Sequence, residues 1–167
     1  VRNAINEGRI PGPRLKVSGQ SLGITGGHCD QNLLPKQYNM RNDAIADGPW
    51  AIREQVREHK KYGVDLIKFC ATGGMLSKGT SVGDRQYTFE EMQAIVDEAH
   101  MQGLTVAAHA HGAEGIRYAI RAGVDSIEHG SLIDDEGIAM AVKNGTFLTL
   151  DIYTSEYLVA EGANVGF

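Results

Sequence analysis

Hydrophobic and polar positions follow one repeated order along the chain: an amphipathic helix, a glycine, and a short apolar run that ends in a polar residue. The clearest unit begins at Thr88, where Glu91 three residues later predicts a capped helix start. The apolar positions that follow have the spacing of a helix with one buried face: Phe89, Met92, Ile95, Val96 and Ala99. Gly103 ends this helix, and an apolar strand is expected over 104–109.

The same order occurs three more times. Further helices are predicted over 49–62, over 113–122 and from about 134, and they end at Gly63, Gly123 and Gly145. Strands are expected directly after these glycines, over 64–70, 124–129 and 146–153. One more apolar run, over 15–19, follows a helix-like segment that ends in Gly8, and it is expected to form a fifth strand.

Helices that alternate with nearly continuous apolar strands predict a parallel α/β fold whose sheet is covered on both faces. We expect part of a (β/α)8 TIM-like barrel, about strands 3 to 7. Because a closed barrel has eight strands and commonly about 250 residues, residues 1–167 are expected to be the central portion of a catalytic barrel, with its first and last strands outside this chain. An open doubly wound sheet is the alternative, although its Gly-x-Gly-x-x-Gly motif is absent.

Polar residues end the predicted strands at similar distances from the preceding glycine. Lys68 lies five residues after its glycine, and His109, His129 and Asp151 each lie six residues after theirs. We therefore expect these four side chains at about the same height on the carboxyl-terminal rim, where α/β barrels carry their chemistry.

Lys68 lies between apolar residues, so a free ammonium there is costly unless it is paired or modified. Three interpretations of Lys68 remain open. It could form a salt bridge across the barrel, act as a Schiff-base nucleophile with a lowered pKa, or be carbamylated by CO₂ and bridge two metal ions.

His109 and His129 end adjacent predicted strands, which lie about 4.8 Å apart. Imidazoles at equal height on such strands can share one Zn²⁺, and a structural pair is the alternative. His111 should face the same side as His109, where we expect it to meet substrate or to support the metal ligands. Glu128 should point toward the helices, in a structural ion pair.

Other residues near the rim complete the candidate site. The glycine-rich loop 23–30 delivers His28 to the rim, within reach of a substrate carbonyl. Gly73 and Gly74 let the backbone approach a ligand, or only turn the chain. Asp151 and Tyr153 are expected on one side of a continuing strand, where Tyr153 could contact substrate.

Composition narrows the classes of partner. The net charge is −5 and there is no Lys/Arg block, which argues against nucleic acid. No apolar run approaches the ~20 residues of a membrane span, and a cytoplasmic location is the default expectation. The only two cysteines, Cys29 and Cys70, are expected to be small buried hydrophobic residues rather than a disulfide framework.

Several motifs in order resemble the amidohydrolase superfamily, in particular its imidazolonepropionase-like branch with Xaa-Pro dipeptidases (prolidases) and zinc-dependent arginine/lysine carboxypeptidases. The motifs are Pro-Gly-Pro-Arg at 11–14, Thr-Gly-Gly-His at 25–28, Ile-Lys at 67–68, Ala-Thr-Gly-Gly at 71–74, His-Ala-His-Gly at 109–112 and Ile-Glu-His-Gly at 127–130. The His-Ala-His-Gly form and the segment 150–162 look most similar to the carboxypeptidases.

The resemblance implies a hydrolase with two divalent metal ions, expected to be zinc, that cleaves a peptide bond in dipeptides or at the C-terminus of short peptides. By position, Lys68 resembles the carbamylated lysine that bridges the metals, and His109 and His129 resemble ligands of the second metal. His28 resembles the histidine that polarises the scissile carbonyl, and His111 the group that meets the substrate carboxylate.

The family's first-strand His-x-His pair is expected before Val1, and its last-strand aspartate beyond Phe167. A Schiff-base lyase centred on Lys68 and an inactive, truncated barrel are the alternatives to the hydrolase. Besides a small peptide substrate, the expected partners are further copies of the chain or the remaining segments of the barrel.

Overall fold

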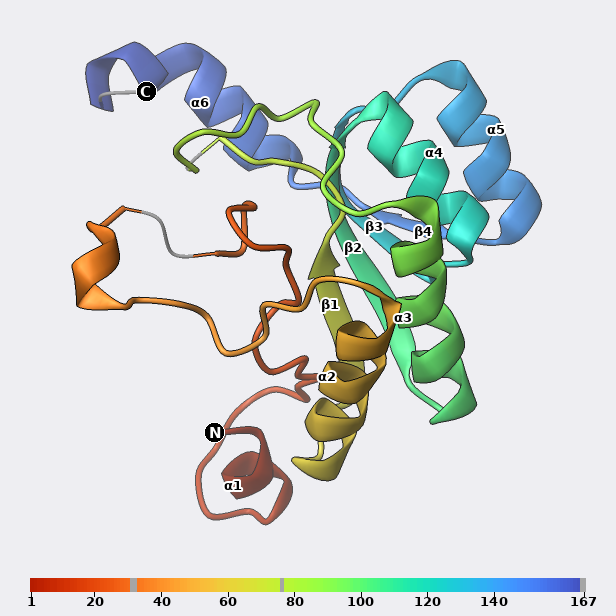
Figure 1. Cartoon of the computed structure of the whole chain (residues 1–167). Helices are drawn as coiled ribbons and strands as arrows, with labels where there is room; N and C mark the ends of the chain where they lie inside the picture. Colours follow the sequence, from red (N-terminus) through yellow and green to blue (C-terminus); the bar gives the residue numbers. More distant parts are fainter. Residues whose placement is uncertain (31–32, 76, 166–167) are drawn as a thin grey trace.

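Four parallel strands form one sheet in the order β1-β2-β3-β4, and helices α2 to α5 all lie on one side of it (Figure 1). The computed structural model describes residues 1–30, 33–75 and 77–165; Phe167 lies outside the described residues. The strands are β1 (Leu66–Cys70), β2 (Thr105–Gly112), β3 (Ser126–Leu132) and β4 (Phe147–Thr149). The repeated helix-glycine-strand order therefore gives the parallel α/β fold expected of a barrel segment.

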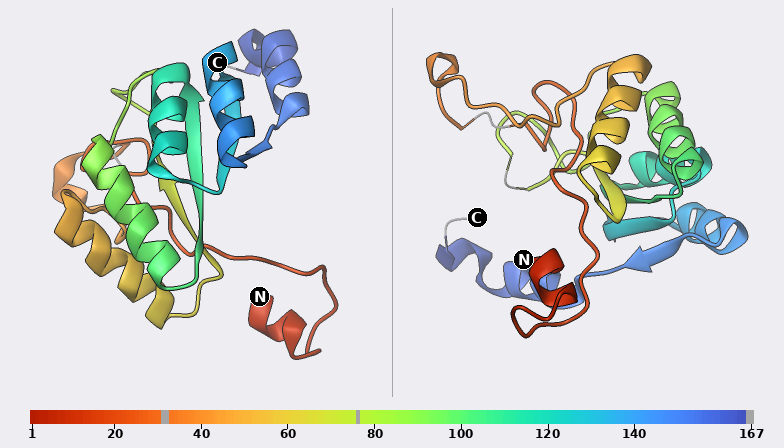
Figure 2. Two further views of the ribbon diagram at one scale, coloured as in Figure 1. Left: turned by 90° about the vertical axis from the view of Figure 1, so that its right-hand side faces the viewer. Right: turned by 90° about the horizontal axis from the view of Figure 1, so that it is seen from below.

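Each crossover helix joins two neighbouring strands, as the repeated units predict. Within the described residues, the helices and a short 3-10 turn are α1 (Arg2–Asn6), η1 (Lys36–Tyr38), α2 (Pro49–Lys61), α3 (Phe89–Met101), α4 (Ala113–Ala122), α5 (Asp135–Asn144) and α6 (Ile152–Val165). The N-terminal segment and α6 lie on the side of the sheet away from α2 to α5 (Figure 2).

Local sequence explains where these helices begin and end. Thr88 and Glu91 form the expected capping box at the start of α3, and the Asp134 side chain accepts a hydrogen bond from Gly137 N at the start of α5. Gly123 and Gly145 end α4 and α5 with left-handed φ angles of 98° and 71°.

The core lies between the sheet and the helix layer. From the strands, Ile67, Phe69, Val106, Ala108 and Ile127 are buried on this side. From the helices they meet Ile52, Val56, Met92, Ile95, Ile116 and Ile120, each no more than 1% exposed. The opposite face of the sheet, which carries Lys68 and His109, is therefore free to hold polar groups.

The strand register corrects the expectation that Lys68 and the histidines lie at one height. Lys68 pairs with Ala107, whereas His109 pairs with Cys70 on one side and Glu128 on the other. Lys68 is thus two residues nearer the amino end of the sheet than His109. The count from the glycine failed because Leu66, three residues after Gly63, pairs with Thr105, which is only two residues after Gly103, and because Lys68 is itself one residue closer to its glycine than His109 is.

Two predicted strands also differ from the structure. The run 15–19 forms no strand; Gly19 has a φ of 69°, and pairing with β1 begins only at Leu22, which bridges Phe69. The expected strand over 146–153 ends at Thr149, and Tyr153 belongs to α6. Leu150 and Asp151 turn the chain between these two elements.

Cys29 and Cys70 form a disulfide, with 6.2 Å between their Cα atoms. The expectation of two unpaired cysteines is therefore wrong. They are 41 residues apart in sequence, and only the fold brings the loop after Leu22 against the end of β1.

Candidate metal centre

Four imidazoles gather at the carboxyl ends of the strands. His109 and His111 come from β2, His129 from β3 and His28 from the loop after Leu22. The His109 ring stacks on His28 at a centroid distance of 4.3 Å, and its centroid lies 4.8 Å from that of His111 and 4.7 Å from that of His129. The structure thus brings together all four histidines that the sequence placed at the rim.

Three of these histidines have the arrangement of a metal site. One ring nitrogen from each of His109, His111 and His129 lies within 4.8 Å of the others. Imidazole nitrogens are preferred donors for Zn²⁺ and similar divalent ions, so this donor set fits a metal ion. The sequence predicted His109 and His129 as ligands but placed His111 among the groups that meet substrate or support the ligands.

An unusual backbone conformation brings His129 into the cluster. His129 has a φ of 73°, and Gly130 follows with a φ of 61°. The alternation of the strand is broken there, and the pairing of β2 with β3 shifts register between Ala110 and Gly112. Glu128 faces the inner side by the regular alternation that buries Ile127 among the helices, and the break brings His129 to the same side. The expectation that Glu128 points toward the helices is therefore wrong.

Each ring has one nitrogen engaged by a neighbouring oxygen. His109 Nε2 lies 3.1 Å from the Gly73 carbonyl, and His111 Nδ1 lies 2.9 Å from Ser131 Oγ. His129 Nδ1 lies 3.0 Å from Asp151 Oδ1. Such partners fix the tautomer and the orientation of a ligating imidazole.

His28 is held by a different set of contacts. Its Nδ1 is hydrogen-bonded to Ser77 Oγ, and its backbone N–H donates to Gln86 Oε1 at 2.8 Å. A Cβ at Gly74 would lie 2.2 Å from the Cε1 atom of the His28 ring. Gly74 therefore makes room for this ring, and a contact of Gly73 or Gly74 with substrate remains a prediction.

The electrostatics of the cluster favour neutral imidazoles. Burial lowers the pKa of His109 to about 3, although its contact with the Gly73 carbonyl acts in the opposite direction. Burial also lowers the pKa values of His28 and His111, and His129 lowers both further. Near neutral pH these rings are unprotonated, which is the form that binds a metal ion.

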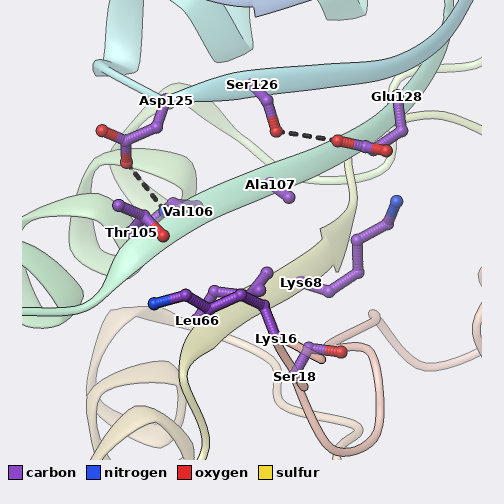
Figure 3. Close-up of a pocket in the computed structure, with 10 residues that line it drawn as sticks. All are labelled: Lys16, Ser18, Leu66, Lys68, Thr105, Val106, Ala107, Asp125, Ser126 and Glu128. Atoms are coloured by element: carbon purple, nitrogen blue, oxygen red, sulfur yellow. Dashed lines mark hydrogen bonds between the residues drawn. The ribbon is translucent and has the colours of Figure 1, made fainter. Parts of the chain in front are cut away.

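Lys68 lies next to this cluster and toward the amino end of the sheet. Its side chain and that of Glu128 extend into one cavity of about 280 Å³, from β1 and β3 (Figure 3). Burial lowers the pKa of the Lys68 ammonium, while Glu128 and Asp151 raise it. Lys68 is not part of the three-histidine group, and its role as a metal ligand remains a prediction.

A second cavity, of about 290 Å³, opens directly on the histidines. Its walls include all four rings, Asp151 and three residues that the sequence analysis did not select: Met75, Thr154 and Leu158. Tyr153 does not line this cavity and its side chain is 79% exposed, so its contact with substrate also remains a prediction. No motif marks Met75 or Leu158, because each is an ordinary apolar residue until the fold places it here.

Comparison with known proteins agrees with this arrangement. A model of the Amidohydrolase family matches residues 1–167. The ochratoxinase of Aspergillus niger is 38% identical over 151 residues, which are 81% of this chain and 32% of that protein.

Solved structures extend the likeness to three dimensions. A Xaa-Pro dipeptidase with methionine bound in its active site is 39% identical, with a TM-score of 0.90 over 99% of this chain and 41% of that one. A prolidase complexed with N-methylphosphonate-L-proline is 33% identical, with a TM-score of 0.86 over 99% of this chain and 43% of that one. The chain thus spans well under half the length of these relatives. The match over its whole length shows that it belongs to the amidohydrolase family.

Proposed function

We propose that this chain carries part of the active site of a metal-dependent hydrolase that cleaves an amide bond in a small substrate. The observation that carries this proposal is the convergence of His109, His111 and His129, with nitrogens within 4.8 Å of one another. The relatives named as ochratoxinase, Xaa-Pro dipeptidase and prolidase support a hydrolase.

The chain's own residues would hold the metal as follows. His109 and His129 are the proposed ligands of one ion, with His111 close enough to join them. Lys68, carbamylated, is the proposed bridge to a second ion. A divalent ion bound here supplies a hydroxide near neutral pH and polarises the substrate carbonyl.

His28 is the proposed hydrogen-bond donor to the substrate carbonyl oxygen. Its Nδ1 is engaged by Ser77, which leaves Nε2 for the cavity. Burial lowers the pKa of this imidazole and keeps it neutral. The donor role requires the tautomer in which Nδ1 accepts from the Ser77 hydroxyl and Nε2 carries the proton. A donor placed where negative charge develops stabilises the transition state.

The cavity wall bears on the substrate class. Met75 and Leu158 give it an apolar side. Among the described residues that line it, Asp151 is the one carboxylate, and it is engaged with His129. This favours an apolar group beside the scissile amide over a lysine or arginine side chain, and it favours a dipeptidase or similar amidase over a basic carboxypeptidase.

The test is hydrolysis, by the complete protein that contains this chain, of Xaa-Pro dipeptides and N-acyl amino acids with apolar or basic side chains. We expect turnover that a chelator abolishes and Zn²⁺ with bicarbonate restores, highest for the apolar substrates. Turnover that is unaffected by chelation, or a borohydride-trapped substrate adduct on Lys68, would instead support the Schiff-base lyase. Absence of turnover with all of these amides would contradict the proposal.

A further inference from the structure

The Cys29–Cys70 disulfide joins the loop that carries His28 to β1, the strand that pairs with β2, which carries His109. Cys29 directly follows His28 in the chain, and Cys70 is the register partner of His109 in the sheet. The rings of His28 and His109 are stacked, with centroids 4.3 Å apart. The covalent link therefore runs beside the contact between the two rings.

The surrounding structure is built around this link. A Cβ at position 23 would lie 2.6 Å from the Cβ of Cys29, so Gly23 leaves the space that the bridge occupies. The Cα separation of 6.2 Å lies within the range found for disulfides. Cys70 is buried, whereas Cys29 is partly exposed, so a reductant has access to the bridge from the side of Cys29.

Without the bridge, the described contacts of His28 and Cys29 include the stacking of the His28 ring on His109 and several hydrogen bonds. Gln86 accepts from the His28 backbone N–H, Ser77 contacts the His28 ring, and Asn42 donates to the Cys29 carbonyl. These keep the loop nearby, but each is individually weak and exchanges with water. Loss of the covalent link should loosen the ring of His28 without unfolding the sheet.

We propose that the Cys29–Cys70 disulfide is a positioning element for His28, and that the redox state of this pair sets the activity of the site. The inference rests on the proposed function, because it assigns regulation to the same site. The reductant is a dithiol. Its thiolate attacks one sulfur of the bridge, its second thiol resolves the mixed disulfide, and two electrons and two protons pass to Cys29 and Cys70. The dithiol leaves as a disulfide, and re-oxidation restores the bridge.

The test compares oxidised and reduced protein. Because dithiols bind zinc, the reductant used is a phosphine, which becomes the phosphine oxide by taking oxygen from water. We expect reduction, or Cys29→Ser, to lower kcat about tenfold through displacement of His28. KM and bound metal should change little, and re-oxidation should restore the wild-type protein but not the variant.

The His28→Ala variant separates positioning from general stability. In this background, reduction should cause no further loss of kcat, because the group that the bridge positions is gone. If reduction lowered the kcat of His28→Ala by the same factor as that of the wild-type protein, the proposal would be overturned. Free thiols at both cysteines in protein purified without reductant would also overturn it.

A second readout does not depend on turnover. In protein labelled at histidine Cε1, the NMR signal of His28, identified by its absence from His28→Ala, should shift on reduction while that of His59 stays in place. An unchanged His28 signal would overturn the inference even if hydrolysis is confirmed, and a shift without hydrolysis of any amide would contradict only the proposed function.

Discussion

At the scale of single residues, the site depends on side chains whose positions do not follow from the regular alternation of a strand. His129 reaches the cluster with a positive φ of 73°, a conformation that is uncommon for residues other than glycine. Backbone strain of this kind persists where the surrounding contacts require it, and it gathers at functional sites. The contact of His129 Nδ1 with Asp151 holds the ring in this position.

Replacement of Asp151 tests that contact. Asp151→Asn should weaken metal binding about 10- to 100-fold, because the carboxylate fixes the tautomer and the orientation of the His129 ring. Metal affinity is measured by titration calorimetry. Asp125→Asn is the matched control, since Asp125 pairs with His100 at 2.8 Å but outside the cluster. Equal losses of affinity in both variants would contradict the role given to Asp151.

Gly74→Ala tests the space for the His28 ring. The added methyl group would lie 2.2 to 2.6 Å from three ring atoms, so the ring must move. We expect kcat to fall about tenfold or more, with bound metal unchanged. Gly83→Ala is the control, because a Cβ there meets nothing within 4 Å. Unchanged kcat in Gly74→Ala would show that the ring position is not critical.

At the scale of elements, the sequence predicts the regular units well, because helix caps, terminating glycines and apolar periodicity are local. The capping box at Thr88 and the glycine end of α4 at Gly123 are both confirmed. The Cys29–Cys70 bridge and the register of Lys68 depend on how distant segments meet, which no local pattern encodes. The same holds for His129, which shares the inner side with Glu128 only because its backbone departs from the alternation of the strand.

A contact between α2 and α3 predicts that the stability of the fold depends on pH. Glu98, 1% exposed, accepts hydrogen bonds from Arg57, Arg53 and Gln102. Its hydrogen bond with Arg57, opposed by burial and aided by Gln102 and Arg53, lowers its pKa from 4.5 to about 2. The folded state therefore binds this proton less readily than the unfolded state does, and the stabilisation is present above about pH 4.5 and lost as pH falls toward 2.

Glu98→Gln should remove that part of the pH dependence and lower the free energy of unfolding near neutral pH by about 1–3 kcal/mol. Urea unfolding across the acid range measures both effects. Asp97→Asn is the control, because Asp97 is 56% exposed and its 3.6 Å ion pair with Arg53 contributes little. If the free energy of unfolding of Glu98→Gln fell with pH as steeply as that of the wild-type protein, this account would be contradicted.

At the scale of the whole molecule, the two edges of the sheet differ. Beside β1, Leu22 bridges Phe69 and partly covers the edge, whereas β4 pairs only with β3 among the described strands. Phe147 on β4 is 75% exposed and Val142 on α5 is 79% exposed. Exposed apolar surface of this kind favours association between chains.

None of the helices in the described ranges is long and apolar enough to cross a membrane.

Because of its exposed apolar surface, the 167-residue chain should associate as its concentration rises, measured by size-exclusion chromatography with light scattering. Phe147→Lys with Val142→Lys should reduce this association. Trp50→Lys is the control, because Trp50 is 83% exposed on α2, away from β4. A wild-type chain that stays monomeric at all concentrations would contradict the prediction. So would a Trp50→Lys variant whose association falls as much as that of the Phe147→Lys, Val142→Lys double variant.

The central claim is that histidines from β2 and β3 hold a divalent metal ion, and the most direct measurement is the metal content of the purified protein. Elemental analysis and zinc titration should give bound metal in the wild-type protein and in His100→Ala, whose ring lies outside the cluster. His109→Ala and His129→Ala should each lose most of it, since each removes one of the three converging donors. Metal content that stays at the wild-type level in both variants would contradict the account.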